Sequence, residues 1–99
     1  MPRYSFSKIK VRLDEMIAAD LEPELHLFMY DKEYIIIGYK DRCSFQRCGT
    51  CDGSGELFYN TLDELYNSIT LDNILLKRDW NDITNFECID YEWHYDKKF

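Results

Sequence analysis

Four cysteines are the residues of this 99-residue chain whose type and spacing allow the most specific chemistry. Cys48 and Cys51 stand two residues apart, and two thiolates at this spacing can bind one metal ion because the turn between them points both sulfur atoms inward. A closed tetrahedral zinc site needs four ligands, so Cys43 and Cys88 would have to supply the other two. One hypothesis is therefore a structural zinc site with the ligands Cys43, Cys48, Cys51 and Cys88.

The octet Cys48-x-x-Cys51-x-Gly53-x-Gly55 resembles the zinc-binding repeat of the DnaJ-type chaperones, C-x-x-C-x-G-x-G. The resemblance covers eight of the 99 residues. In that family the repeat occurs in several copies and two copies complete each zinc site, whereas this chain has one copy. The resemblance implies the local shape of a metal-binding knuckle and no chaperone activity.

A second interpretation of the cysteines needs no metal. Free cysteine is among the most buried residue types, so Cys43 and Cys88 can serve as small core residues. A single C-x-x-C motif without a partner pair favours this interpretation over zinc. A redox role for Cys48 and Cys51 is disfavoured, because Asp52 opposes a thiolate and the glycine-rich sequence that follows does not start a helix.

No pattern of an active site accompanies the cysteines. The two histidines, His26 and His94, stand apart from any nucleophile pattern, and the chain has no G-x-S-x-G, H-E-x-x-H, phosphate-loop or dinucleotide-binding motif. Carboxylates are numerous, but most fall at positions that suit helix faces and turns. We therefore expect no catalytic residues and no enzymatic activity.

Aromatic residues make up 16% of the chain, which is more than a core of this size needs. Tyr and Trp at a surface favour protein contacts, because they are large, rigid and amphipathic. The acidic C-terminal stretch with Tyr91, Trp93 and Tyr95 is the predicted contact face. The alternative is that these rings cover the back of a sheet, where half-buried aromatic residues are common.

The net charge of −7 is distributed unevenly along the chain. Residues 1–50 hold eight basic and eight acidic side chains, whereas residues 51–99 hold four basic and eleven acidic ones. An acidic surface disfavours phosphate, so a nucleic-acid partner is not expected. The acidic half motivates a further hypothesis, an acidic mimic of nucleic acid that inhibits a DNA-binding protein.

Length and composition predict a single cytoplasmic domain over residues 1–99, with a loose leader at 1–6 and a frayed tail at 96–99. The sequence has no apolar run of about 18 residues that could span a membrane. It also begins without the apolar segment of a secretory signal. Thiols stay reduced in the cytoplasm, so disulfides are not expected. The abundance of Ile, Lys, Asn, Asp and Tyr fits an AT-rich bacterial or phage genome.

The first element is predicted to be a helix over residues 7–21 with Ser7 as its N-cap. Apolar residues recur at spacings of three and four on one face, and Pro23 follows the helix; these residues are Phe6, Ile9, Leu13, Met16 and Ile17. Residues 8–13 also alternate between polar and apolar, which is the period of a strand. We prefer the helix because Met16 and Ile17 continue its pattern.

A β-hairpin follows, with strands at residues 25–30 and 34–39 and a polar turn at 31–33. The run Ile35-Ile36-Ile37 is apolar at consecutive positions, which predicts a central strand covered on both faces or partly covered by the first helix. Further strands are predicted at 43–47 and 56–59. The glycine-rich residues 48–55 between them are predicted to be a loop.

The C-terminal half is predicted to return from helix to strand. Thr61 and Glu64 form a capping box that starts a helix at 62–69, and its apolar face continues to Ile69. A turn at 71–74 and a short helical segment at 75–80 follow. The last strand is predicted within 86–95, at an edge of the sheet because of its acidic content.

These elements predict an α+β domain of two layers, in which an antiparallel sheet of four to five strands carries helices on one face. The leading functional hypothesis is a small protein-binding or regulatory module without catalysis, whose partner is another protein or a second copy of itself through an edge strand. A zinc-stabilised domain and an acidic nucleic-acid mimic are the alternatives.

Overall fold

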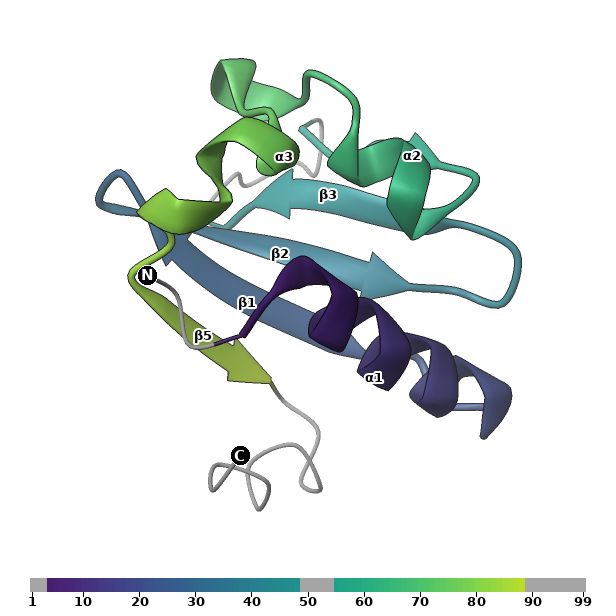
Figure 1. The fold of residues 1–99 in the computed structure, drawn as a ribbon. Helices are drawn as coiled ribbons and strands as arrows, with labels where there is room; N and C mark the ends of the chain where they lie inside the picture. The colour runs from purple at the N-terminus through teal and green to yellow at the C-terminus, as the bar shows by residue number, and fades with distance from the viewer. Residues whose placement is uncertain (1–3, 49–54, 89–99) are drawn as a thin grey trace.

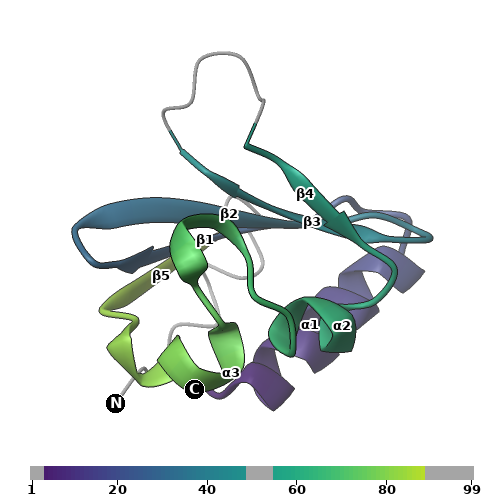
Figure 2. The same ribbon diagram turned by 90° about the horizontal axis from the view of Figure 1, so that it is seen from above.

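The computed structural model describes residues 4–48 and 55–88. One five-stranded antiparallel sheet carries helices on one of its faces, which confirms the predicted α+β fold (Figures 1 and 2). In the described residues no helix is long and apolar enough to span a membrane. The elements in chain order are α1 (Phe6–Ala18), β1 (Glu24–Met29), β2 (Lys32–Gly38), β3 (Cys43–Arg47), β4 (Leu57–Tyr59), α2 (Leu62–Tyr66), the 3₁₀ helix η1 (Leu71–Asn73), α3 (Leu76–Asp79), the 3₁₀ helix η2 (Trp80–Asp82) and β5 (Asn85–Cys88).

The strands lie in the order β4-β3-β2-β1-β5. The first four follow one another as a meander, and the chain then passes over the helix-covered face and returns as β5 beside β1 (Figure 1). Every neighbouring pair is antiparallel. β2 is therefore a central strand and β5 an edge strand, as predicted. The predicted continuation of the last strand, residues 89–95, lies outside the described residues.

The first element is a helix, and its buried residues are those that the spacing of three and four predicts. It starts earlier than predicted, because the hydroxyl of Ser5 and not that of Ser7 caps it, accepting from the backbone N–H of Lys8 at 3.2 Å. It also ends earlier. Asp20 adopts a φ of 63°, and its N–H donates to the carbonyl of Ile17. This left-handed residue closes the helix as a glycine would.

Tyr4 and Phe6, which were expected to belong to a loose leader, are core residues. Tyr4 is 4% exposed, and its ring lies 5.5 Å from that of Phe86. The indole N–H of Trp80 donates to the carbonyl of Tyr4 at 2.9 Å. The N-terminal end of the described chain is therefore fixed against residues that lie far along the sequence.

The turn of the first hairpin consists of Tyr30 and Asp31, and not of residues 31–33. Their φ angles are 55° and 59°, and Met29 pairs with Lys32 directly across the turn. Two consecutive positive φ angles are the type I′ geometry, whose twist matches that of the strands. The Tyr30 hydroxyl donates to Asp82 at 2.5 Å, which anchors the turn to η2.

The segment between α2 and α3 is held to the sheet by a carboxylate. One hydrogen bond of the predicted capping box is present, because the Thr61 hydroxyl accepts from the backbone N–H of Glu64 at 3.0 Å. The helix α2 is shorter than the predicted 62–69. Beyond it, Asp72 accepts hydrogen bonds from the hydroxyl of Tyr34 at 2.7 Å and from Arg47 at 3.0 Å. The Tyr34 hydrogen bond, followed by Arg47, lowers the pKa of the Asp72 carboxyl.

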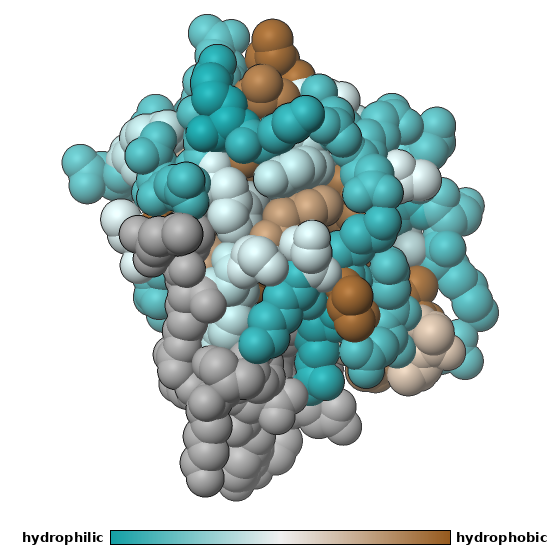
Figure 3. All heavy atoms as spheres, in the orientation of Figure 1, coloured by the Kyte–Doolittle hydropathy of each residue, from teal (hydrophilic) through white to brown (hydrophobic). Residues whose placement is uncertain are grey.

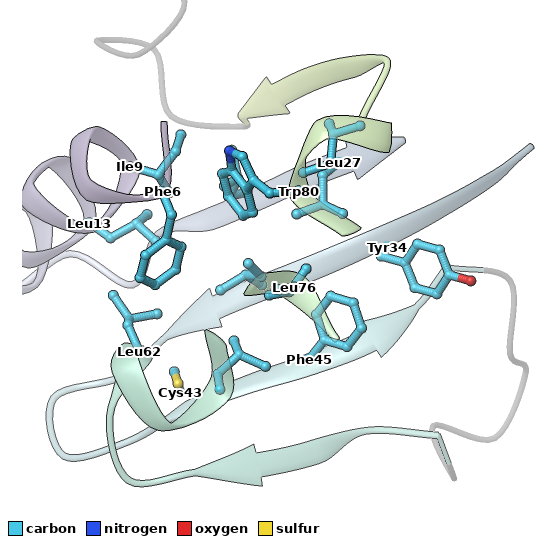
Figure 4. Close-up of a cluster of buried hydrophobic side chains, with 14 of the residues drawn as sticks. Phe6, Ile9, Leu13, Leu27, Tyr34, Cys43, Phe45, Leu62, Leu76 and Trp80 are labelled. Atoms are coloured by element: carbon cyan, nitrogen blue, oxygen red, sulfur yellow. The ribbon is translucent and has the colours of Figure 1, made fainter. Parts of the chain in front are cut away.

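The hydrophobic core lies between the sheet and the helices (Figure 4). Alternate residues of β1 and β2 point into it, and the apolar stripe of α1 covers them. At one end of the core, the rings of Phe6 and Tyr66 stack with centroids 3.9 Å apart, and Trp80 meets Phe6 edge-on at 5.4 Å. This aromatic cluster joins α1, α2 and η2.

Candidate functional site

Cys43, the first of the predicted zinc ligands, is a core residue. It begins β3, is 2% exposed and points into the space between the sheet and α2 (Figure 4). Burial, with a smaller contribution from the charge of Glu64, raises the pKa of its thiol to about 11. The thiol is therefore protonated at neutral pH, as suits a small core residue.

The structure places the backbone of Cys43 apart from those of Cys48 and Cys88, whereas Cys51 lies outside the described residues. Cys88 lies in β5, three strand spacings from β3, which corresponds to about 14 Å. Cys48 is exposed and follows β3 five residues after Cys43, which along an extended strand is about 16 Å. Two sulfur ligands of one zinc ion lie within about 4–5 Å of each other, since each Zn–S bond measures about 2.3 Å.

Four of the predicted site residues lie outside the described residues. They are Cys51 and the predicted contact residues Tyr91, Trp93 and Tyr95. Zinc at the cysteine loop therefore stays a prediction. Within residues 4–48 and 55–88, no group of three or more His, Cys, Asp or Glu side chains is arranged to hold a metal ion.

The surface that distinguishes this molecule is the face of the sheet opposite the helices, which we call the open face. In the described part of the chain no helix covers it (Figure 2). Since side chains alternate along a strand, it consists of the residues that do not enter the core. These are Glu24, His26 and Phe28 of β1, Glu33, Ile35 and Ile37 of β2, Ser44 and Gln46 of β3, Phe58 of β4, and Asn85 and Glu87 of β5.

The centre of the open face is apolar. Phe28, Ile35 and Ile37 are half-buried, and Phe58 is 47% exposed. The opposite, helix-covered side is hydrophilic over most of its area, with separate hydrophobic spots (Figure 3). The large apolar side chains exposed along the helices and their connections are scattered ones such as Val11 and Ile69. The open face therefore gathers apolar side chains from three strands on one side of the sheet.

Acidic side chains border this apolar centre. The Nδ1 atom of His26 lies 2.5 Å from a carboxylate oxygen of Glu33, and its Nε2 atom lies 4.0 Å from Glu24. Glu87 of β5 stands directly opposite His26 in the register. The carboxylates of Glu24, Glu33 and Glu87 thus lie around His26 on the β1 side of the open face and form its acidic border.

At its β4 side the open face ends in a cluster of one arginine and two aromatic rings. The guanidinium of Arg42 lies 4.3 Å from the ring centroid of Phe58 and 5.4 Å from that of Tyr39. The Tyr39 hydroxyl is 3.4 Å from a carboxylate oxygen of Glu56. Burial, followed by the charge of Glu56, raises the pKa of Tyr39. Arg42 is therefore the cation that flanks the face at this corner.

A cavity of about 340 Å³ opens at the end of the sheet between α1 and the turns that precede β3 and α2. Its charged lining is balanced in sign and is partly paired, since Lys10 donates to Asp63 at 2.7 Å. No nucleophile with an adjacent base lines it among the described residues. The cavity gives no support to a catalytic function.

The sequence interpretation missed the open face, although its signal was present. The run Ile35-Ile36-Ile37 places Ile36 in the core and its two neighbours on the other face of a central strand. We expected such a strand to be covered on both faces or partly covered by the first helix. In the described residues the helices cover only one, so the apolar run marks a surface as well as a core.

Comparison with known proteins adds no relative from which a function could be transferred. No family model, no curated protein and no solved structure matches this chain. A function for this chain is therefore inferred from its own residues and fold.

Proposed function

We propose that this chain is a protein-binding module that acts without catalysis and docks its partner on the open face of the sheet. The observation that carries the proposal is the chemistry of the outward positions of β1 and β2. An antiparallel sheet with one uncovered face ordinarily alternates apolar inward and polar outward residues. Here Phe28, Ile35 and Ile37 break that alternation. A partner that covers them removes apolar area from water, which favours association.

The charge around this centre defines the chemistry of the partner. Glu24, Glu33 and Glu87 border the face, and the whole chain carries a net charge of −7. A complementary protein surface presents an apolar centre with Lys or Arg around it. Association with such a surface is accelerated by the opposite charges and slows as salt screens them.

The test compares two double variants as baits for partner capture. Ile35→Thr with Ile37→Thr places hydroxyls at the apolar centre and retains β-branched side chains that suit a strand. The matched control, Val11→Thr with Ile69→Thr, makes the same kind of change at exposed positions away from the open face. Far-UV circular dichroism and thermal unfolding verify that both variants are folded.

A specific partner should be recovered by the wild-type chain and by the control, and lost with the open-face variant. The dissociation constant measured with the purified partner should rise at least tenfold for the open-face variant, since two apolar contacts are lost. Equal binding by both variants contradicts the assignment of this face. Binding that is insensitive to salt contradicts a basic partner.

A further inference from the structure

The β4 edge of the sheet has the features of a strand-pairing surface. β4 pairs with β3 on one side only and is the last strand of the sheet in that direction. Its residues Leu57 and Phe58 are 37% and 47% exposed, and no residue of Leu57–Tyr59 carries a formal charge. Proteins usually protect such an edge with charges, proline or a bulge. Within residues 4–48 and 55–88, the shortness of β4 is the one such protection that the strand itself shows.

From this edge we infer that two copies of the chain associate by antiparallel pairing of β4 with β4, about a two-fold axis through Phe58. In this register Phe58 stands opposite Phe58, and Leu57 stands opposite Tyr59 of the second copy. Facing pairs of aromatic and aliphatic side chains stabilise neighbouring antiparallel strands. A two-fold arrangement satisfies both edges at once, so the assembly closes as a dimer.

Charge complementarity supports a second copy as the occupant. The register of β3 and β4 pairs Cys43 with Tyr59, so one residue further Arg42 stands opposite Asn60. Across the two-fold axis, Asn60 in turn faces Glu56 of the second copy. Arg42 and that Glu56 then share a row on the open face, two strand spacings or about 10 Å apart at their Cα atoms. Their long side chains can meet over this distance.

The position of the Arg42 side chain agrees with this pairing. Its guanidinium already lies over the ring of Phe58, 4.3 Å from the centroid. Phe58 belongs to the edge strand β4, so the cation is displaced toward the free edge. The opposite edge strand, β5, carries Glu87 within its four residues. Self-pairing there would bring carboxylates into neighbouring rows. The distribution of charge therefore selects β4 over β5.

The dimer joins the two sheets into one and places their open faces side by side. This inference depends on the β4 edge and not on the function proposed above, so either can fail without the other. A three-residue edge with its flanking side chains buries less surface area than a standard interface. We therefore expect weak association of the two copies, with a Kd of about 10–100 µM.

Sedimentation equilibrium of the full chain, from about 1 µM to about 1 mM, measures this association directly. We expect the wild-type mass to rise from monomer to dimer over that range. Phe58→Glu sets two carboxylates against each other at the axis and should remain monomeric throughout. The matched control, Asn85→Glu, adds the same charge on the open face of the other edge strand and should dimerise like the wild type.

Exchanging the charges of Arg42 and Glu56 tests the register of the β4–β4 pairing. It also distinguishes a broken contact from a misfolded variant, because a misfolded chain would not associate in a mixture. Arg42→Glu and Glu56→Arg should each be monomeric alone, because each homodimer would contain two repulsive pairs. An equimolar mixture should dimerise, since both Arg–Glu pairs are restored in the heterodimer. A monomeric wild type at about 1 mM, loss of association in Asn85→Glu, or no association in the mixture would overturn the inference.

Discussion

At the scale of single residues, burial makes the thiol of Cys43 less reactive than that of Cys48. The pKa of Cys43 is raised to about 11 by burial, so at pH 8 only about one thiol in a thousand is the reactive thiolate. Cys48 is exposed. We predict that iodoacetamide alkylates Cys48 within minutes under native conditions and modifies Cys43 only when urea unfolds the chain. Peptide mass spectrometry measures both sites in one sample, and rapid native labelling of Cys43 would contradict its burial.

The core residues of α1 were predictable one by one, whereas its cap was not. Helical spacing identifies Phe6, Ile9 and Leu13 as buried, because a period of 3.6 brings them to one face. Both Ser5 and Ser7 are acceptable caps from sequence alone. With Ser5 as the cap, Phe6 is the first helical residue, and its ring stacks on that of Tyr66.

At the scale of elements, most helices and strands were predicted and their ends were often misplaced. The strand at residues 43–47 and the start of α2 at Leu62 agree with the sequence patterns. The early end of α1 and the tight hairpin turn depend on Asp20 and Tyr30, which adopt positive φ without being glycine. Sequence gives little signal for such residues, because surrounding contacts hold them in that conformation.

Asp20 provides a test of how α1 ends. Its φ of 63° suits glycine better than any residue with a Cβ atom. We predict that Asp20→Gly raises the free energy of unfolding by about 0.5–1 kcal/mol. Its ion pair with Lys40 at 2.9 Å is highly exposed, so the loss of that contact weighs little. Urea denaturation monitored by circular dichroism measures the change.

The variant Asp20→Ala is the control for that prediction. It removes the same carboxylate and the same ion pair, but it keeps a Cβ atom at the left-handed position. It should therefore be about 1 kcal/mol less stable than Asp20→Gly. If both variants have the same unfolding midpoint, backbone strain at Asp20 contributes nothing and the closing turn is held in another way.

At the scale of the whole molecule, layers were predictable and the closure of the sheet was not. Strands joined by short turns predict an antiparallel meander, and the amphipathic helices predict one covered face. Pairing of β5 with β1 joins residues that are about 60 positions apart, for example Leu25 and Cys88. Such a contact has no local signal. The uncovered face follows from that layering, but its apolar character was missed, because the run Ile35-Ile36-Ile37 also fits a strand with both faces covered.

Trp80 joins the two ends of the described chain. Its indole N–H donates to the buried carbonyl of Tyr4, 76 positions away, and its ring packs against Phe6 and Phe86. Trp80→Phe keeps a ring in the core but removes the indole N–H that donates to this carbonyl. We predict a loss of about 1–3 kcal/mol in the free energy of unfolding, measured by urea denaturation.

The same variant distinguishes a local from a global role of this hydrogen bond. If Trp80 fixes the N-terminal residues only, limited proteolysis should cleave ahead of α1 faster while the main unfolding transition stays unchanged. We expect both to change together, because Trp80 also contacts Tyr66 of α2 and Phe86 of β5. Loss of its packing therefore weakens one cooperative unit that includes the edge strand.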